Sequence, residues 1–166
     1  MKIEAEVLYP NIRDWGDGFY CWMDPDEQSL LNLASIRQYQ SPNLKYHYST
    51  KLHCTIMYHE RELPLHPQFP LDGYRAATVA RYDIWTVPQG HLLVAVLDSP
   101  QLEALHFQFR AAGFIHSYED YTPHTTLGEY SVMDDRAVSH MELLNRSLPA
   151  FKLKYGPQIY ADSIGN

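Results

Sequence analysis

Hydrophobic and polar residues alternate with period 2 in several stretches of the chain, a pattern typical of β-strands with one buried face. Two of these stretches flank Val87-Pro88-Gln89-Gly90, a turn with proline at its second position, and together they predict a hairpin. The strands predicted from this pattern are Met1 to Val7, Phe19 to Met23, Ala77 to Val87, His91 to Leu97, Phe151 to Tyr155 and Gln158 to Ala161.

Three other stretches place apolar residues three and four positions apart, as expected for helices with one apolar face. They are Asp24 to Gln40, Asp98 to Gly113 and Asp134 to Ser147. The first helix is predicted to begin at Asp24 as N-cap, with Pro25 at the first helical position and Glu27 completing a capping box. The chain therefore alternates predicted strands and helices.

One further strand pattern carries polar side chains on a single face. In Leu52-His53-Cys54-Thr55-Ile56-Met57, a strand would place His53 and Thr55 on one face. Leu52, Cys54 and Ile56 would then form the opposite, apolar face, so Cys54 is expected to fill the core.

The same chemistry recurs in His124-Thr125-Thr126-Leu127, where His124 and Thr126 would share a face. The next residue on that face is Gly128, which we expect to leave room beside them. The two histidines lie 71 residues apart, which is too far for one local motif but suits two similar lobes that meet at a cleft.

The two His-x-Thr segments have matched surroundings. Each follows an acidic cap with a proline, an amphipathic helix and a loop; His53 lies 29 positions after Asp24, and His124 lies 26 positions after Asp98. This order indicates an internal duplication. Because no linker separates the halves, we expect residues 1–166 to form a single domain.

Charge and composition restrict the partners. The chain has 45% hydrophobic and 20% charged residues, as in ordinary globular proteins, and a formal net charge of −7, which argues against holding duplex nucleic acid. No apolar run approaches the roughly 20 residues that a membrane span needs. With two cysteines, Cys21 and Cys54, and no signal-peptide pattern, a cytoplasmic location is expected. The oligomeric state stays open.

Two histidines and two threonines facing one cleft fit the cleavage of a phosphodiester. One imidazole can take a proton from the nucleophile while the other gives a proton to the leaving oxygen. The threonine hydroxyls can donate to the non-bridging oxygens, and the scheme requires no metal or other cofactor. A single His-x-Thr is more simply a polar strand face, but two copies in matched contexts favour catalysis by His53, Thr55, His124 and Thr126.

The paired motifs, with the hairpin from Ala77 to Leu97 and a helix between them, resemble the two-histidine (2H) phosphoesterases, the LigT-like family. The resemblance spans roughly residues 18 to 162; Gly128 departs from the apolar residue that usually follows the motif. It implies an α+β, bilobal fold with two pseudo-symmetric lobes of mainly antiparallel sheet and a central cleft. It also implies metal-independent cleavage of nucleotide phosphodiesters or 2′,3′-cyclic phosphates.

Within that family the chain is most similar to phage anti-CBASS nucleases, which degrade the cyclic oligonucleotide messengers of bacterial immunity. This resemblance implies a small cyclic oligonucleotide as substrate, with Tyr20 and Trp85 stacking on its bases, in the host cell cytoplasm. Core packing is the alternative role for both rings. Trp22 shares a face with Tyr20, so the sequence leaves open which of them contacts ligand.

Two other functions remain open at this stage. One is an RNA-processing 2′,3′-cyclic phosphodiesterase, against which the net acidity argues; the other is a module that sequesters nucleotides without turnover. The other histidines show no zinc-ligand spacing and are expected on the surface or in loops. They are His47, His59, His66, His91, His106, His116 and His140.

Overall fold

The computed structural model describes residues 3–4, 18–41, 43–60, 72–118 and 120–163. Its strands are β1 (Ile3–Glu4), β2 (Phe19–Pro25), β3 (Tyr46–Tyr48), β4 (Cys54–His59), β5 (Arg75–Val87), β6 (Gly90–Asp98), β7 (His124–Tyr130) and β8 (Lys152–Ser163). Its helices are α2 (Glu27–Ala34), the 3₁₀ helix η2 (Ser35–Tyr39), α3 (Pro100–Ala111) and α4 (Asp135–Ser147). The described residues thus form an α+β fold.

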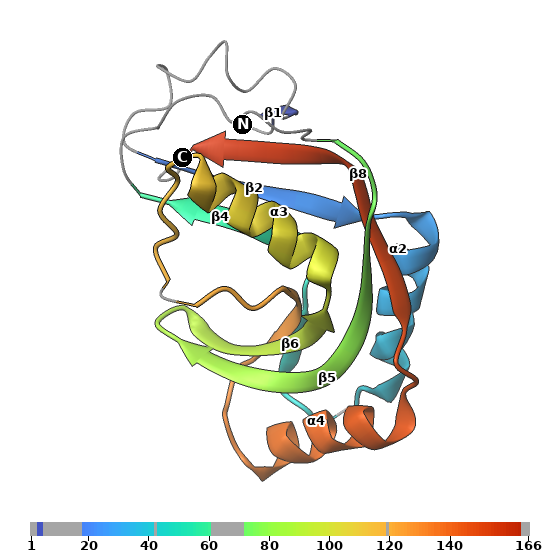
Figure 1. Cartoon of the computed structure of the whole chain (residues 1–166). Helices are drawn as coiled ribbons and strands as arrows, with labels where there is room; N and C mark the ends of the chain where they lie inside the picture. The colour runs from blue at the N-terminus through green and yellow to red at the C-terminus, as the bar shows by residue number, and fades with distance from the viewer. Residues whose placement is uncertain (1–2, 5–17, 42, 61–71, 119, 164–166) are drawn as a thin grey trace.

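The strands belong to one antiparallel sheet in the order β1-β8-β2-β4-β7-β6-β5, with β3 on β7. Besides β1, strand β8 pairs with two neighbours: Ala161 faces Cys21 in β2, and Leu153 faces Ala77 in β5. Figure 1 shows β8 running along β2 and then turning down beside β5. The pairing therefore closes on itself, with β4 and β7 on the side away from β8.

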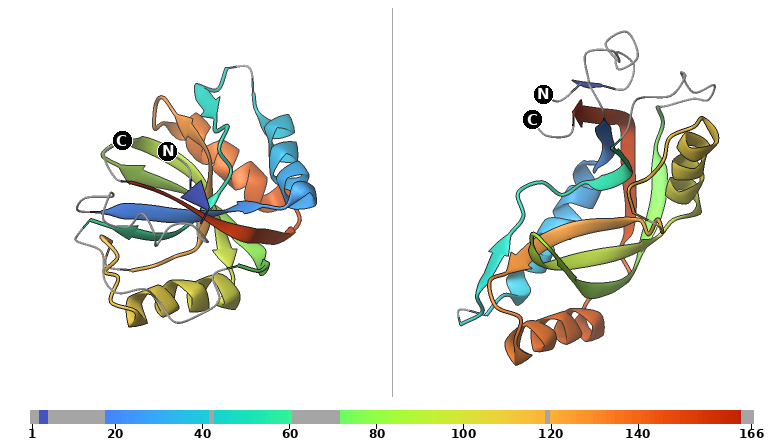
Figure 2. Two further views of the ribbon diagram at one scale, coloured as in Figure 1. Left: turned by 90° about the horizontal axis from the view of Figure 1, so that it is seen from above. Right: turned by 90° about the vertical axis from the view of Figure 1, so that its left-hand side faces the viewer.

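The helices cover separate parts of this sheet. Helix α3 packs on β4 and β5, α4 on β5, and α2 on β8 and β2. Figures 1 and 2 show α4 at one end of the molecule, well away from α3. The side chains of His53, Thr55, His124 and Thr126 are half-buried, so part of each can line a site.

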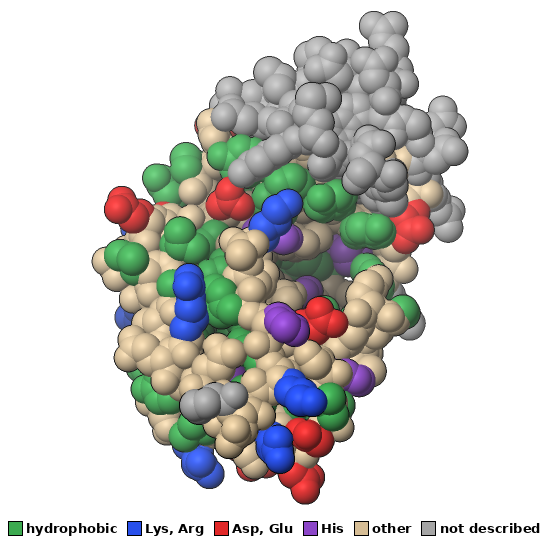
Figure 3. All heavy atoms as spheres, turned by 180° about the vertical axis from the view of Figure 1, so that it is seen from behind, with side chains coloured by type: hydrophobic (Ala, Val, Ile, Leu, Met, Phe, Trp, Pro, Cys, Tyr) green, Lys and Arg blue, Asp and Glu red, His purple; other side chains and the backbone are tan. Residues whose placement is uncertain are grey.

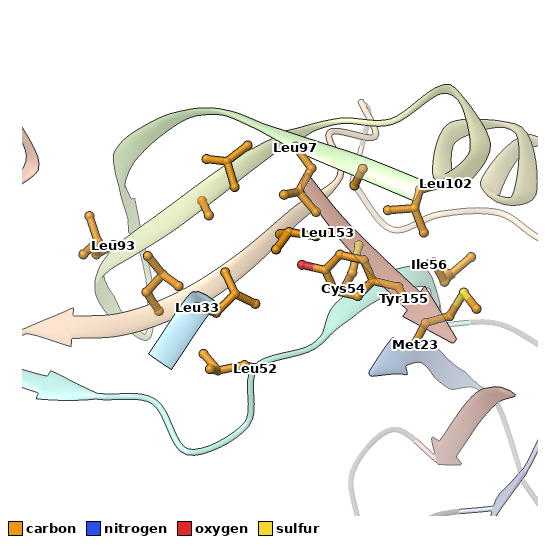
Figure 4. Close-up of a cluster of buried hydrophobic side chains, with 14 of the residues drawn as sticks. Met23, Leu33, Leu52, Cys54, Ile56, Leu93, Leu97, Leu102, Leu153 and Tyr155 are labelled. Atoms are coloured by element: carbon orange, nitrogen blue, oxygen red, sulfur yellow. The ribbon is translucent and has the colours of Figure 1, made fainter. Parts of the chain in front are cut away.

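The enclosed side of the sheet is filled by apolar side chains, shown in Figure 4. Leu52, Cys54 and Ile56 are at most 6% exposed and lie in this core, as the alternation of the first motif predicts. Full burial of a large aliphatic or aromatic side chain stabilises a fold by about 1.5–3 kcal/mol. The core therefore fixes which face of β4 looks outward.

The predicted start of the first helix at Asp24 is wrong by two residues. The N-cap of α2 is Asp26, whose carboxylate accepts a hydrogen bond of 2.8 Å from the Ser29 amide. Strand β2 runs on to Pro25 because it continues to pair with β8, where Pro25 faces Tyr155. Tertiary pairing overrides the local cap signal, and Asp24 instead lines a cavity beside His53.

Most other predicted elements are confirmed with small changes. The β5–β6 hairpin turns at Pro88-Gln89, and Ser99 caps α3 by accepting a 3.0 Å hydrogen bond from the Leu102 amide. The two strands predicted near the C-terminus are one, β8. Of the predicted strand Met1 to Val7 only β1 is described; the rest lies outside the described residues.

Candidate active site

The two His-x-Thr segments lie side by side where β4 pairs with β7. Cys54 faces Thr125 across this antiparallel pair. Continuing this register by one residue in each direction would set His53 opposite Thr126 and Thr55 opposite His124, and such neighbours have Cβ atoms about 4.5–8 Å apart. The structure thus brings two imidazoles and two hydroxyls from distant parts of the chain onto one face.

Each segment is followed by a β-bulge immediately after its threonine. Ile56 is passed over in the pairing of β4 with β2, since Thr55 faces Trp22 and Met57 faces Cys21. Leu127 is passed over in the same way between β7 and β6. A bulge re-aims the side chains that follow it. The matched positions of the two bulges support the predicted internal duplication.

The prediction that Gly128 leaves room beside His124 and Thr126 is wrong. After the bulge Gly128 is buried and faces Tyr48 of β3. A Cβ atom at position 128 would collide with the phenol of Tyr46, which is 8% exposed. The glycine therefore makes room for a core tyrosine rather than for a ligand.

Both histidines are held by the main chain two residues earlier. Nδ1 of His124 lies 2.9 Å from the Thr122 carbonyl oxygen, which can only accept a hydrogen bond. Nδ1 therefore carries the proton and Nε2 of neutral His124 is left as a proton acceptor. A backbone group of Lys51 makes the corresponding bond to His53 and raises its pKa.

Burial is the main influence on both titrations. It lowers the pKa of His53 and of His124 below the ordinary value for histidine. The Asp24 carboxylate opposes this at His53 and raises its pKa, whereas Lys51 and His124 lower it further. Among the described residues, a carboxylate influences the pKa of His53 but not that of His124.

A cavity of about 460 Å³ adjoins His53 and is lined by Tyr20, Trp22, Asp24 and Lys51, among others. The Trp22 ring lies 5.8 Å from the His53 ring and is 8% exposed. Tyr20 stacks on Trp22 at 5.1 Å and is half-buried. Tyr20 is thus the more accessible of the two rings, and Trp22 backs the histidine.

A second cavity, of about 380 Å³, adjoins Thr55 and His124 and is lined by Tyr58, Trp85, Tyr118, Tyr121 and Asp120, among others. The half-buried Trp85 ring lies 4.4 Å from the His124 ring. Its indole N–H donates to the Asp83 carboxylate at 3.1 Å, which fixes the ring in place. Both volumes lie in the range of small-molecule sites, and Figure 3 shows histidines around a hollow on the face opposite to that of Figure 1.

Aromatic and basic residues missed by the sequence prediction support the second cavity. Tyr121 donates from its hydroxyl to the Thr55 carbonyl oxygen at 2.8 Å, which ties the loop before His124 to the first motif. The His106 ring stacks on Tyr121 at 3.9 Å and 4°. Arg110 donates to Nε2 of His106 at 2.6 Å, so Nδ1–H of His106 donates to the Ile56 carbonyl oxygen, also at 2.6 Å.

The expectation that the other histidines lie on the surface is wrong for three of them. His59, His106 and His140 are 1%, 0% and 7% exposed. His106 could have been predicted, since it continues the apolar stripe of α3 formed by Leu102, Leu105 and Phe109. The other two are held by contacts that sequence spacing does not show; His66 lies outside the described residues.

The part of the chain that the structure describes contains neither a metal-binding cluster nor a membrane-spanning helix. Within it, no group of three or more His, Cys, Asp or Glu side chains is arranged to hold a metal ion. No helix there combines the length and apolar character needed to cross a membrane. The candidate site therefore consists of the His–Thr face and its two flanking cavities.

Comparison with known proteins identifies relatives of this arrangement. The family model described as "Anti-CBASS protein Acb1" matches residues 17–149, which include both motifs. An anti-CBASS protein Acb1 of Enterobacteria phage T4 is 38% identical over 117 residues, 70% of this chain and 74% of that protein. The Acb1 of Yersinia phage phiR1-RT is 38% identical over 77 residues (46% and 49%), and that of Escherichia phage RB16 is 28% identical over 136 residues (81% and 75%). The chain belongs to the anti-CBASS protein Acb1 family.

Proposed function

We propose that this protein is a metal-independent phosphodiesterase of the two-histidine type that hydrolyses cyclic oligonucleotide messengers in the host cytoplasm. The observation that carries the proposal is the convergence of His53, Thr55, His124 and Thr126 across the β4–β7 pair. Membership in a phage anti-CBASS family supports the choice of substrate. The paired, bulged motif strands support the two-lobed 2H arrangement.

His124 acts as the general base and His53 as the general acid. Neutral His124 has its Nδ1 proton committed to the Thr122 carbonyl oxygen, so Nε2 is available to accept a proton. The Asp24 carboxylate raises the pKa of His53 and so opposes the lowering by burial, Lys51 and His124. The opposite charge stabilises an imidazolium, which is the form that an acid needs before reaction.

One hydrolysis cycle transfers two protons and exchanges one bond to phosphorus for another. His124 Nε2 removes a proton from a water molecule as its oxygen bonds to phosphorus, and the bond from phosphorus to the ribose oxygen breaks. Protonated His53 gives its proton to that departing oxygen. Thr55 and Thr126 donate hydrogen bonds to the non-bridging oxygens, where charge develops. Exchange with solvent returns both imidazoles to their starting forms.

The two cavities would receive the nucleosides on either side of the scissile phosphate. Tyr20 lies in one and Trp85 in the other, each half-buried with part of its ring accessible. Stacking on an aromatic ring contributes about 1–3 kcal/mol per base with little base preference. This accounts for binding a small cyclic nucleotide despite the net charge of −7.

The test is chromatography of products from a panel of cyclic di- and trinucleotides, incubated with the protein in excess chelator. We expect linear products at the wild-type rate seen without chelator. Preferential cleavage of RNA ends bearing 2′,3′-cyclic phosphate would favour an RNA-processing role. Intact ligand after prolonged incubation with stoichiometric protein would refute catalysis and favour sequestration.

A further inference from the structure

The second cavity contains a third imidazole that the proposed mechanism does not use. His116 lies on the loop after α3 and lines the same cavity as Thr55, Trp85 and His124. Its ring packs edge-on against His106 at 4.9 Å and against Tyr121 at 5.7 Å. The His116 ring is therefore held by His106 and Tyr121, the two stacked rings that connect the loop before His124 to the first motif.

The main chain of β4 fixes the tautomer of His116. The backbone N–H of Tyr58 donates to Nδ1 of His116 at 3.1 Å, and the Ser117 amide donates to the Tyr58 carbonyl oxygen at 2.8 Å. An amide N–H can only donate, so Nδ1 must be unprotonated. The single proton of the neutral ring then sits on Nε2.

The charge state of His116 is constant under ordinary conditions. Burial and the neighbouring His106, Arg110 and His124 lower the pKa of His116 to about 4. The ring is thus neutral near pH 7. No described residue accepts a hydrogen bond from Nε2 of His116, although its ring borders the cavity.

We infer that His116 is a substrate-binding residue whose Nε2–H donates a hydrogen bond to an acceptor atom of the nucleotide that occupies the second cavity. The acceptor is a phosphate oxygen or an atom on the base edge. This inference rests on the proposed function for the identity of the ligand. It assigns His116 to binding, and not to proton transfer.

Two substitutions separate the donor from the other roles of the ring. His116→Asn keeps an acceptor for the Tyr58 amide but lacks the distant N–H, whereas His116→Phe keeps the packing against His106 and Tyr121 but has neither nitrogen. His47→Asn on exposed β3 is the matched control. Thermal melts verify that each variant folds.

The first measurement is titration of the bis-phosphorothioate analogues of cyclic di-adenylate and cyclic di-uridylate, which resist hydrolysis. We expect both His116 variants to raise Kd about tenfold, the size of one lost hydrogen bond to ligand. Equal effects on both analogues place the acceptor on the ribose-phosphate backbone; an effect on one only places it on a base. A loss confined to His116→Asn or to His116→Phe would overturn the inference, because it would indicate packing or the Tyr58 contact instead.

The second measurement is turnover of the natural diesters by the same variants. The expected result is a higher KM with kcat within twofold of wild type and both limbs of the pH profile unmoved. A displaced limb, or an unchanged KM in an active enzyme, would overturn the inference while leaving the proposed function intact. Binding by wild type without any hydrolysis would refute the proposed function and leave the role of His116 in place; no binding of either analogue would refute both.

Discussion

The two halves of the site have the same backbone arrangement but differ in the residues around them. Each has a histidine held by the main chain two residues earlier, a threonine, and a bulge directly after it. His53 adjoins a cavity with the charged residues Asp24 and Lys51. His124 adjoins a cavity with several aromatic rings, Trp85 at 4.4 Å among them, and with Asp120 as its charged residue.

This difference teaches how a duplicated motif can acquire two roles. In the proposed mechanism the backbone symmetry presents equivalent imidazoles to one phosphorus atom, but acid and base must differ in protonation before the reaction begins. The carboxylate of Asp24 acts on His53 alone, so residues outside the motif break the symmetry. The predictions below probe first the shared parts and then the differences.

The largest effect is expected from removing either imidazole. His53→Ala and His124→Ala should each lower kcat on a cyclic dinucleotide by more than about 10³-fold, since general acid–base help is worth about 10²–10⁴-fold per group. The exposed His47→Ala is the control and should match wild type. Rates within tenfold of wild type for either site variant would remove that histidine from the mechanism.

Loss of a threonine hydroxyl should cost less. Thr55→Val and Thr126→Val keep the shape of the side chain and should each lower kcat by about 10²-fold with KM little changed, because the lost hydrogen bond stabilises charge in the transition state. Steady-state kinetics separates the two parameters. A rise in KM alone would instead assign these hydroxyls to ground-state binding.

The two stacking rings test whether the ligand spans both cavities. Tyr20→Leu and Trp85→Leu should each raise KM about tenfold, and the double variant about a hundredfold, since each ring meets a separate base. If only one single variant changes KM, the ligand occupies one cavity and the other ring is a packing residue.

The smallest effect discriminates the two histidines. Asp24→Asn removes the carboxylate that raises the pKa of His53, so that pKa should fall. If His53 is the acid, the alkaline limb of the kcat/KM profile moves to lower pH and the acidic limb stays. Movement of the acidic limb would exchange the roles assigned to His53 and His124.

Features with a local cause could be predicted from the sequence, and those with a distant cause could not. Alternation around Cys54 predicts which face of β4 is buried, and Asp98-Ser99-Pro100-Gln101 predicts the start of α3, although the cap is Ser99 and not the acidic Asp98. Asp24 has the local signature of a cap, but pairing with β8 holds it in β2 beside His53. No spacing rule links these distant segments.

The same reasoning applies within the site. His53 and His124 could be paired from the repeated motif alone, without knowledge of the β4–β7 register. His116 gave no such signal, because its orientation depends on the Tyr58 amide, 58 positions earlier in the chain. The prediction that Gly128 leaves room beside His124 and Thr126 fails because the bulge at Leu127 breaks the alternation on which it depends.

The division of labour between the imidazoles is tested most directly with a leaving group that needs no proton. The p-nitrophenyl ester of thymidine 5′-phosphate is compared with a cyclic dinucleotide, in excess chelator, for wild type, His53→Ala and His124→Ala. We predict that His53→Ala hydrolyses the nitrophenyl ester within about tenfold of the wild-type rate although it fails on the cyclic dinucleotide, whereas His124→Ala fails on both. Equal losses in the two variants on both substrates would contradict the account.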